Sequence, residues 1–182
     1  MKSGPLKPGS ASAIRANIWV KIYENNFVQT TATTITITGL DSSVDKEYKV
    51  STKLINGYNG GCKAIVRLNN VSTSYGYQYV NGGESAIAAA RGTTDGFYVA
   101  SDTALGQVDT AEIVINAIPG YVRTAITELT YTAYSTTAGA LYLTGASWAV
   151  TSNITSISLT TDQTNGIGSN SYITLWKRAY AT

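Results

Sequence analysis

The most informative segment of the chain is Asn153-Ile-Thr-Ser-Ile-Ser-Leu-Thr-Thr-Asp-Gln-Thr-Asn-Gly-Ile-Gly-Ser-Asn-Ser-Tyr-Ile-Thr-Leu-Trp-Lys-Arg178. Apolar and polar residues alternate in two of its segments, Ile154–Thr160 and Ser171–Lys177. Successive side chains of a β-strand point to opposite faces, so this alternation indicates two strands with one buried face each. The apolar residues that share a face are Ile157 and Leu159, and Ile173 and Leu175. Turn residues around Asn165-Gly166-Ile167-Gly168 separate the segments, and the pattern predicts a closing β-hairpin.

The composition of the whole chain favours β-structure. Of its 182 residues, 43% are hydrophobic and 13% are charged, about half the charged fraction of an average globular protein. Serine and threonine take the polar strand positions instead, and threonine is β-branched and suits a pleated strand. The chain also holds 13 tyrosines, which carry large apolar rings with a polar tip. We therefore expect an all-β protein.

Alternating segments and turn signals extend the pattern along the chain. Further strands are expected at Ile18–Tyr23, Thr33–Thr38, Tyr48–Leu54, Cys62–Leu68, Tyr75–Val80, Gly96–Ala100, Ala111–Ile118, Thr124–Ala133 and Ala140–Leu143. Ser85–Arg91 is strand or coil, because its alanines suit a helix and its neighbours suit a strand. Turns such as Asn56-Gly57 and Pro119-Gly120 separate the strands at short intervals. Many short strands without a long helical period predict a jelly-roll-like antiparallel β-sandwich over residues 17–182.

Residues 1–16 form a separate segment in this interpretation. Prolines and glycines at positions 4, 5, 8 and 9 disfavour regular structure, which predicts a short extended N-terminal arm. An arm with so little apolar surface of its own gains order by docking onto a partner. We expect it to attach the protein to another subunit through Lys2, Leu6, Lys7 and Ile14. The alternative is that the arm folds back on its own sandwich.

Several functional classes are excluded or disfavoured by what the sequence lacks. The net charge is +2 without clustered Lys or Arg, which argues against nucleic-acid binding, and no apolar run approaches the ~20 residues of a membrane span. The absence of histidine removes Ser-His-Asp triads, Cys-His pairs and imidazole metal sites. Cys62 is alone, so no internal disulfide forms, and we expect a small buried side chain there. We expect no cofactor and no metal, because no Asp-x-Asp-x-Asp-Gly loop is present; calcium held by loop carboxylates and carbonyls is the minor alternative. No secretion signal is evident, so folding in the cytoplasm is expected.

Several motifs, in order and together covering residues 18–178, resemble jelly-roll modules of tailed-bacteriophage virion proteins. They are Gly39-Leu-Asp-Ser-Ser-Val-Asp-Lys-Glu-Tyr48, Leu68-Asn69-Asn70 followed by Tyr75-Gly-Tyr-Gln-Tyr79, Ala89-Ala-Arg91, Ala111-Glu-Ile113, Gly120-Tyr-Val-Arg123 and the C-terminal stretch ending in Trp176-Lys-Arg178. Such modules occur in head decoration proteins, head fibres and tail-associated fibres or adhesins. The resemblance implies a structural, non-enzymatic protein of the virion, assembled in the host bacterial cytoplasm. Its expected partners are other virion proteins, above all the major capsid protein, and further copies of itself, with a trimer as one arrangement.

Tyrosines suggest where a ligand would bind. Tyr75, Tyr77 and Tyr79 share one face of a strand, and with Gln78 nearby they form a candidate platform for a host surface glycan. Tyr58, in the glycine-rich loop Asn56–Gly61, is a second candidate. Packing against the other sheet or a neighbouring subunit is the alternative role of these rings.

Three functions follow in order of preference. The first is a capsid decoration or head-fibre subunit that docks through its arm. The second is a tail-associated receptor-binding, glycan-binding module. The third, a small glycan hydrolase, requires a pair of carboxylates in a cleft, for which Glu112 and Glu128 are the strand residues that can face each other.

Overall fold

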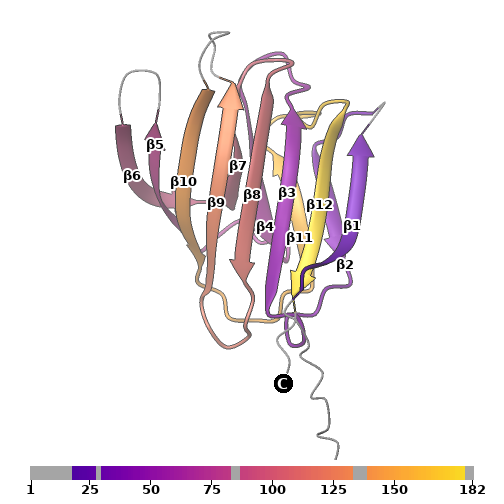
Figure 1. Cartoon of the computed structure of the whole chain (residues 1–182), viewed down its shortest axis with the longest axis vertical. Coiled ribbons are helices and arrows are strands. Elements are labelled where there is room, and N and C mark those ends of the chain that lie inside the picture. Colours follow the sequence, from indigo (N-terminus) through magenta and orange to yellow (C-terminus); the bar gives the residue numbers. More distant parts are fainter. Residues whose placement is uncertain (1–17, 28–29, 83–86, 133–138, 179–182) are drawn as a thin grey trace, which may run out of the picture.

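The computed structural model describes residues 18–27, 30–82, 87–132 and 139–178 (Figure 1). These residues form strands and turns, and none of them belongs to a helix. Accordingly, no helix suited to crossing a membrane occurs among them. The expected arm, with Lys2, Leu6, Lys7 and Ile14, lies outside the described residues.

The described residues form twelve strands. They are β1 (Val20–Phe27), β2 (Thr34–Thr38), β3 (Glu47–Ile55), β4 (Cys62–Leu68), β5 (Tyr75–Gly82), β6 (Ile87–Thr94), β7 (Phe97–Thr103), β8 (Val108–Asn116), β9 (Arg123–Thr132), β10 (Gly139–Trp148), β11 (Ser156–Thr161) and β12 (Ser171–Arg178). The expected all-β sandwich is confirmed. The segment left open between strand and coil is strand β6 from Ile87 onward.

All strands pair antiparallel in two sheets. The large sheet has the order β1-β12-β3-β8-β9-β10-β5-β6 and the small sheet β2-β11-β4-β7. Without the pairs β5–β6 and β9–β10, two four-stranded sheets remain, β1-β12-β3-β8 and β2-β11-β4-β7. This is the order of an eight-stranded jelly roll. The two extra pairs are insertions that both add to the same edge of the large sheet, and Figure 1 shows them side by side beyond β8.

The C-terminal stretch does not form the expected hairpin. β11 lies between β2 and β4 in the small sheet, whereas β12 lies between β1 and β3 in the large one. The loop between them crosses from sheet to sheet, and its Ile167 forms bridges with both Ala32 and Asn56. The period of two predicted the buried faces correctly, since Ile157, Leu159, Ile173 and Leu175 are all buried. The period of two gives no information on which sheet a strand joins. It therefore could not predict that the buried faces of β11 and β12 meet across the core.

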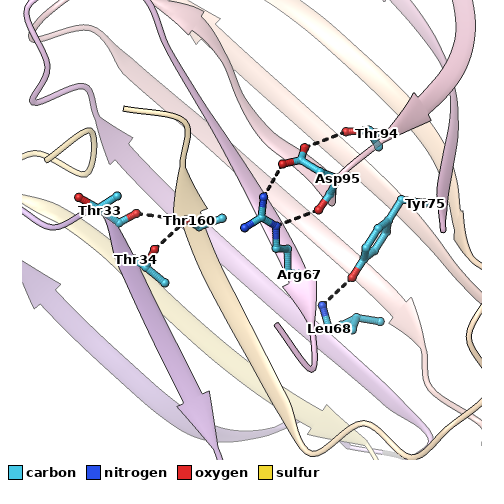
Figure 2. A network of polar contacts seen from close by, with 8 residues as sticks. All are labelled: Thr33, Thr34, Arg67, Leu68, Tyr75, Thr94, Asp95 and Thr160. Carbon is cyan, nitrogen blue, oxygen red and sulfur yellow. Dashed lines mark hydrogen bonds and ion pairs between the residues drawn. The ribbon is translucent and has the colours of Figure 1, made fainter. Parts of the chain in front are cut away.

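The core lies between the two sheets and contains several large aromatic side chains. Tyr75 is stacked on Trp148 with ring centroids 5.8 Å apart and contacts Phe97 edge to face at 5.0 Å. Its hydroxyl oxygen accepts a 2.8 Å hydrogen bond from the backbone N–H of Leu68, as Figure 2 shows. Burial raises the pKa of Tyr75 to about 12. Tyr75 is therefore part of the framework of the protein.

Candidate functional site

The two insertions leave part of the large sheet uncovered. β7 is the last strand of the small sheet and packs against β8 and β9. The strands that follow β9, namely β10, β5 and β6, continue beyond β7 (Figure 1). Along β6, residues 87–93 are all exposed. The inner face of the overhanging strands and the edge of β7 together form a concave surface.

Five tyrosines line this surface and form a continuous chain of rings, in the order Tyr98, Tyr77, Tyr79, Tyr142, Tyr131. The first two rings meet edge to face at 5.7 Å, and the next two are stacked at 5.8 Å. The remaining contacts, to the fourth and fifth rings, are tilted at 5.3 and 5.7 Å. All five side chains are half-buried, so each packs on its neighbours and keeps part of its surface in solvent. We call this site the tyrosine cleft.

The tyrosine cleft encloses a cavity of about 190 Å³. Its lining consists of Lys63, Tyr77, Tyr79, Tyr98, Ala100, Leu129, Tyr142 and Thr144. Small and aliphatic side chains cover the bottom of the cleft, where Ala100 and Leu129 are buried. The volume lies below the roughly 300–1,000 Å³ of pockets for drug-sized ligands, so it suits a single ring-sized group.

Hydroxyl groups make the tyrosine cleft a hydrogen-bonding surface at neutral pH. Burial and a hydrogen bond with Tyr142 raise the pKa of Tyr131 to about 12, so that its phenol stays protonated. Thr144 adds a buried hydroxyl to the lining. A phenol or aliphatic hydroxyl both donates and accepts, and the rings offer flat apolar faces. The cleft can thus bind a ligand that has a flat apolar face and hydroxyls at its edge.

A second hollow of about 150 Å³ adjoins the first around the edge of β7. Lys63 and Tyr98 line both hollows, and the second is completed by Ile65, Arg67, Asp95, Thr160, Thr161 and Asp162. An ion pair joins Arg67 to the carboxylate of Asp95, and the Nε–H of Arg67 also donates to the Asp95 carbonyl at 2.9 Å (Figure 2). We call the two adjoining hollows together the groove; one lies among the tyrosines and the other among polar and charged groups.

The sequence-predicted site residues are only partly brought together. Tyr77 and Tyr79 lie in the tyrosine cleft, but Tyr75 is 2% exposed and belongs to the core. Gln78 lies on the opposite face of β5, where it is exposed. Tyr58 is exposed in its loop and does not line the cleft.

The sequence pattern did not predict the other members of the cleft, which are Lys63, Tyr98, Tyr131 and Tyr142. Each comes from a different strand, and a period of two gives no information on which distant strands are neighbours. The abundance of tyrosine was the one available signal. The register supplies the rest: Tyr79 lies opposite Thr144 on β10, which places Tyr142 diagonally beside it.

The remaining candidate groups lie elsewhere. Glu112 and Glu128 are direct partners in the register of β8 and β9, as the sequence suggested. Both side chains are on the outer face of the large sheet, where Lys49 pairs with Glu112 at 3.4 Å, and neither lines the tyrosine cleft. Cys62 is buried as expected, and burial raises the pKa of its thiol to about 12. Within the described ranges, no group of three or more Cys, Asp or Glu side chains is arranged to hold a metal ion.

Comparison with known proteins identifies no family. No protein-family model matches the chain, and no curated protein matches it either. Among solved structures, the alginate lyase Aly36B in complex with an alginate tetrasaccharide aligns over 86% of this chain and 80% of its own, with 12% identity and a TM-score of 0.26. The infectious bursal disease virus structure aligns over 89% of this chain and 39% of its own, with 16% identity and a TM-score of 0.21. Both alignments are too loose to bear on fold or function.

Proposed function

We propose that this chain is a structural, non-catalytic subunit of a tailed-bacteriophage virion, displayed on the capsid as a decoration or head-fibre protein. The observation that carries the proposal is that the motifs behind the resemblance contact one another in the folded protein. Asp45, from the first motif, pairs with Lys177, from the last, at 3.0 Å, and a second ion pair joins Glu47 to Arg178. The residues of these two motifs thus join the first loop to the last strand, as expected if the resemblance reflects a common fold.

The loop that contains the first motif is fixed by the C-terminal stretch in a second way. Asp41 accepts a 2.9 Å hydrogen bond from the side-chain amide of Asn153, and the Ser42 hydroxyl donates to Asn153 Oδ1 at 2.6 Å. The Ser42 hydroxyl oxygen in turn accepts the N–H of Ile154 at 2.8 Å. Hydrogen bonds from Ser43 and Asn153 lower the pKa of Asp41, so its carboxylate remains charged and acts as acceptor. The loop is therefore a framework element.

The Asn69-Asn70 motif has an equally structural role. Both asparagines adopt left-handed backbone conformations, with φ of 53° and 54°, which asparagine tolerates better than most residues. The side-chain carbonyl of Asn69 accepts N–H groups from Thr155 and Ser156 at 2.8 and 3.2 Å. These bonds tie the turn after β4 to the start of β11, which supports the proposal for the same reason.

The virion role is tested by deleting residues 2–13. We expect the truncated protein to fold, with an unchanged circular-dichroism spectrum, and to be absent from purified phage particles when it replaces the full-length chain during infection. The full-length chain, expressed in the same way, is the control and should be detected in particles by quantitative immunoblotting. Incorporation of the truncated protein at the control level would contradict attachment through the arm, and absence of the full-length chain from particles would contradict the virion role.

The tyrosine cleft favours a second function, binding of a bacterial surface saccharide, as in a tail-associated receptor-binding module. Pyranose rings present a flat apolar face of C–H groups with hydroxyls around the edge, which is the complement of stacked phenols. The tyrosine cleft has room for one sugar ring, and the second hollow beside it can take the next unit of a longer saccharide. Saccharide binding is compatible with display of the protein on a capsid, because the strands that carry the tyrosine cleft lie at one edge of the jelly roll and leave the rest of its surface for contacts with the particle.

The second function predicts a loss of binding when a central ring of the cleft is removed. Tyr79 contacts both Tyr77 and Tyr142, so Tyr79→Ala should weaken saccharide binding by about tenfold, equivalent to roughly 1.4 kcal/mol. Binding is measured by isothermal titration with the bacterial surface polysaccharide that gives the strongest signal on a glycan array. Tyr121→Ala, which removes a 71% exposed ring outside the cleft, is the matched control and should bind normally. Equal affinity of the two variants would contradict a binding role for the cleft.

A further inference from the structure

Within the described part of the chain, Lys63 supplies the one ammonium group of the groove and lies where its two hollows meet. Lys63 is an exposed residue of β4 that lines both hollows, as Tyr98 does. Among the described residues that line the tyrosine cleft, it is the one with a charged side chain. Any ligand that extends from one hollow to the other must therefore pass this ammonium group.

The ammonium group of Lys63 forms no ion pair with a described residue, unlike many other cations of the protein. Arg67 pairs with Asp95, and Lys177 pairs with Asp45. Asp162, an acid that lines the second hollow, accepts the backbone N–H of Lys63 at 2.9 Å through Oδ1. A neutral sugar has no group that requires an unpaired ammonium. An anionic group would gain a charge-assisted hydrogen bond, strengthened by the apolar surroundings of the cleft.

We propose that the tyrosine cleft recognises an anionic oligosaccharide whose carboxylate or phosphate group pairs with Lys63. One sugar ring stacks in the cleft, its charged substituent lies against the ammonium group, and the next unit passes Tyr98 into the second hollow. There it lies against Thr160 and Thr161, whose hydroxyls are already hydrogen-bonded within the protein, to the Thr34 hydroxyl and to the carbonyls of Thr33 and Gln163. Arg67 also lines this hollow, where its ion pair and hydrogen bond with Asp95 fix its side chain. The inference rests on the proposed saccharide binding and adds the class of ligand and the residue that selects it.

The test compares three probe sets on one array: neutral oligosaccharides, oligosaccharides with uronic or sialic acid, and phosphate-containing teichoic acid fragments. We expect the wild-type chain to prefer one of the two anionic sets. Lys63→Gln should weaken binding of the preferred anionic probe about ten- to a hundredfold and leave the weak binding of neutral probes unchanged. Lys63→Arg should retain most of the affinity. Lys53→Gln, on the outer face of the large sheet, is the matched control and should have no effect.

The outcomes separate this inference from the function on which it rests. A preference for carboxylated or for phosphorylated probes, lost in Lys63→Gln, supports the inference and identifies the anion. Preference for neutral probes, or equal affinity of Lys63→Gln and the wild type for anionic ones, would overturn the role of Lys63 while leaving saccharide binding in place. No binding to any set would overturn both. Because the Lys63 side chain is exposed, the variants should unfold at the wild-type temperature, which excludes misfolding as the cause.

Discussion

Replacement of Arg123 by methionine is expected to lower the free energy of unfolding by about 3–5 kcal/mol, because several hydrogen bonds from one buried, charged donor are lost together. Arg123 begins β9 and is fully buried. Its guanidinium donates hydrogen bonds to backbone carbonyls of two loops, and the acceptors are Ile118, Tyr121, Thr151 and Ser152. Methionine fills similar space, but it removes the one donor group that all four carbonyls share, so the two loops lose the hydrogen bonds that join them. The loops that precede β9 and follow β10 would then separate.

The effect is measured by urea denaturation followed by tryptophan fluorescence. Arg91→Met is the matched control, because Arg91 lies on the exposed strand β6, and its unfolding free energy should stay within about 0.5 kcal/mol of the wild type. Arg123→Lys keeps the charge but loses the fork of donors that spans two loops, so it should be nearly as unstable as the methionine variant. A decrease in the free energy of unfolding of less than about 1 kcal/mol for Arg123→Met would contradict the prediction, because water would then have replaced the guanidinium as hydrogen-bond donor.

Replacement of Gly168 by alanine should destabilise the protein by about 3 kcal/mol, the upper part of the range for an overpacked core. Gly168 lies in the loop that carries the chain from β11 to β12. A Cβ atom there would lie 2.7 Å from the carbonyl oxygen of Ile55 and 2.9 Å from the backbone nitrogen of Gly57. Both are backbone atoms, and they cannot move aside as a side chain would. The Gly168 N–H also donates to that Ile55 carbonyl at 2.8 Å, so relief of the clash would break this bond.

Gly145→Ala provides the matched control for Gly168→Ala. Gly145 lies within β10, and a Cβ atom at this position meets no other atom within 4 Å. The control should therefore change the free energy of unfolding by no more than about 0.5 kcal/mol. Urea denaturation at matched protein concentration compares the two variants. Equal stability of the two would mean that the crossover loop is not packed against Gly57 as described.

Much of the secondary structure was predictable because it depends on local patterns. Alternation predicted a strand at Thr33–Thr38, within one residue of β2, and it placed Ile35 and Ile37 on the buried face. The second half of β10 was missed, since Gly145, Ala146 and Ser147 break the alternation of large apolar and polar residues. Strand pairing there is maintained by the backbones of β5 and β9 on either side. A strand that is hydrogen-bonded on both sides can form without a strong alternation of apolar and polar residues in its own sequence.

The class of fold and the buried face of most strands could be predicted from the sequence, because a period of two is a property of neighbouring residues. The folded protein was needed to learn that β11 and β12 belong to different sheets and that two insertions extend one sheet beyond the other. The same is true of the tyrosine cleft, which gathers rings from β5, β7, β9 and β10 with Lys63 from β4. These strands are distant in the chain, and their adjacency follows from pairing and packing of the whole sandwich.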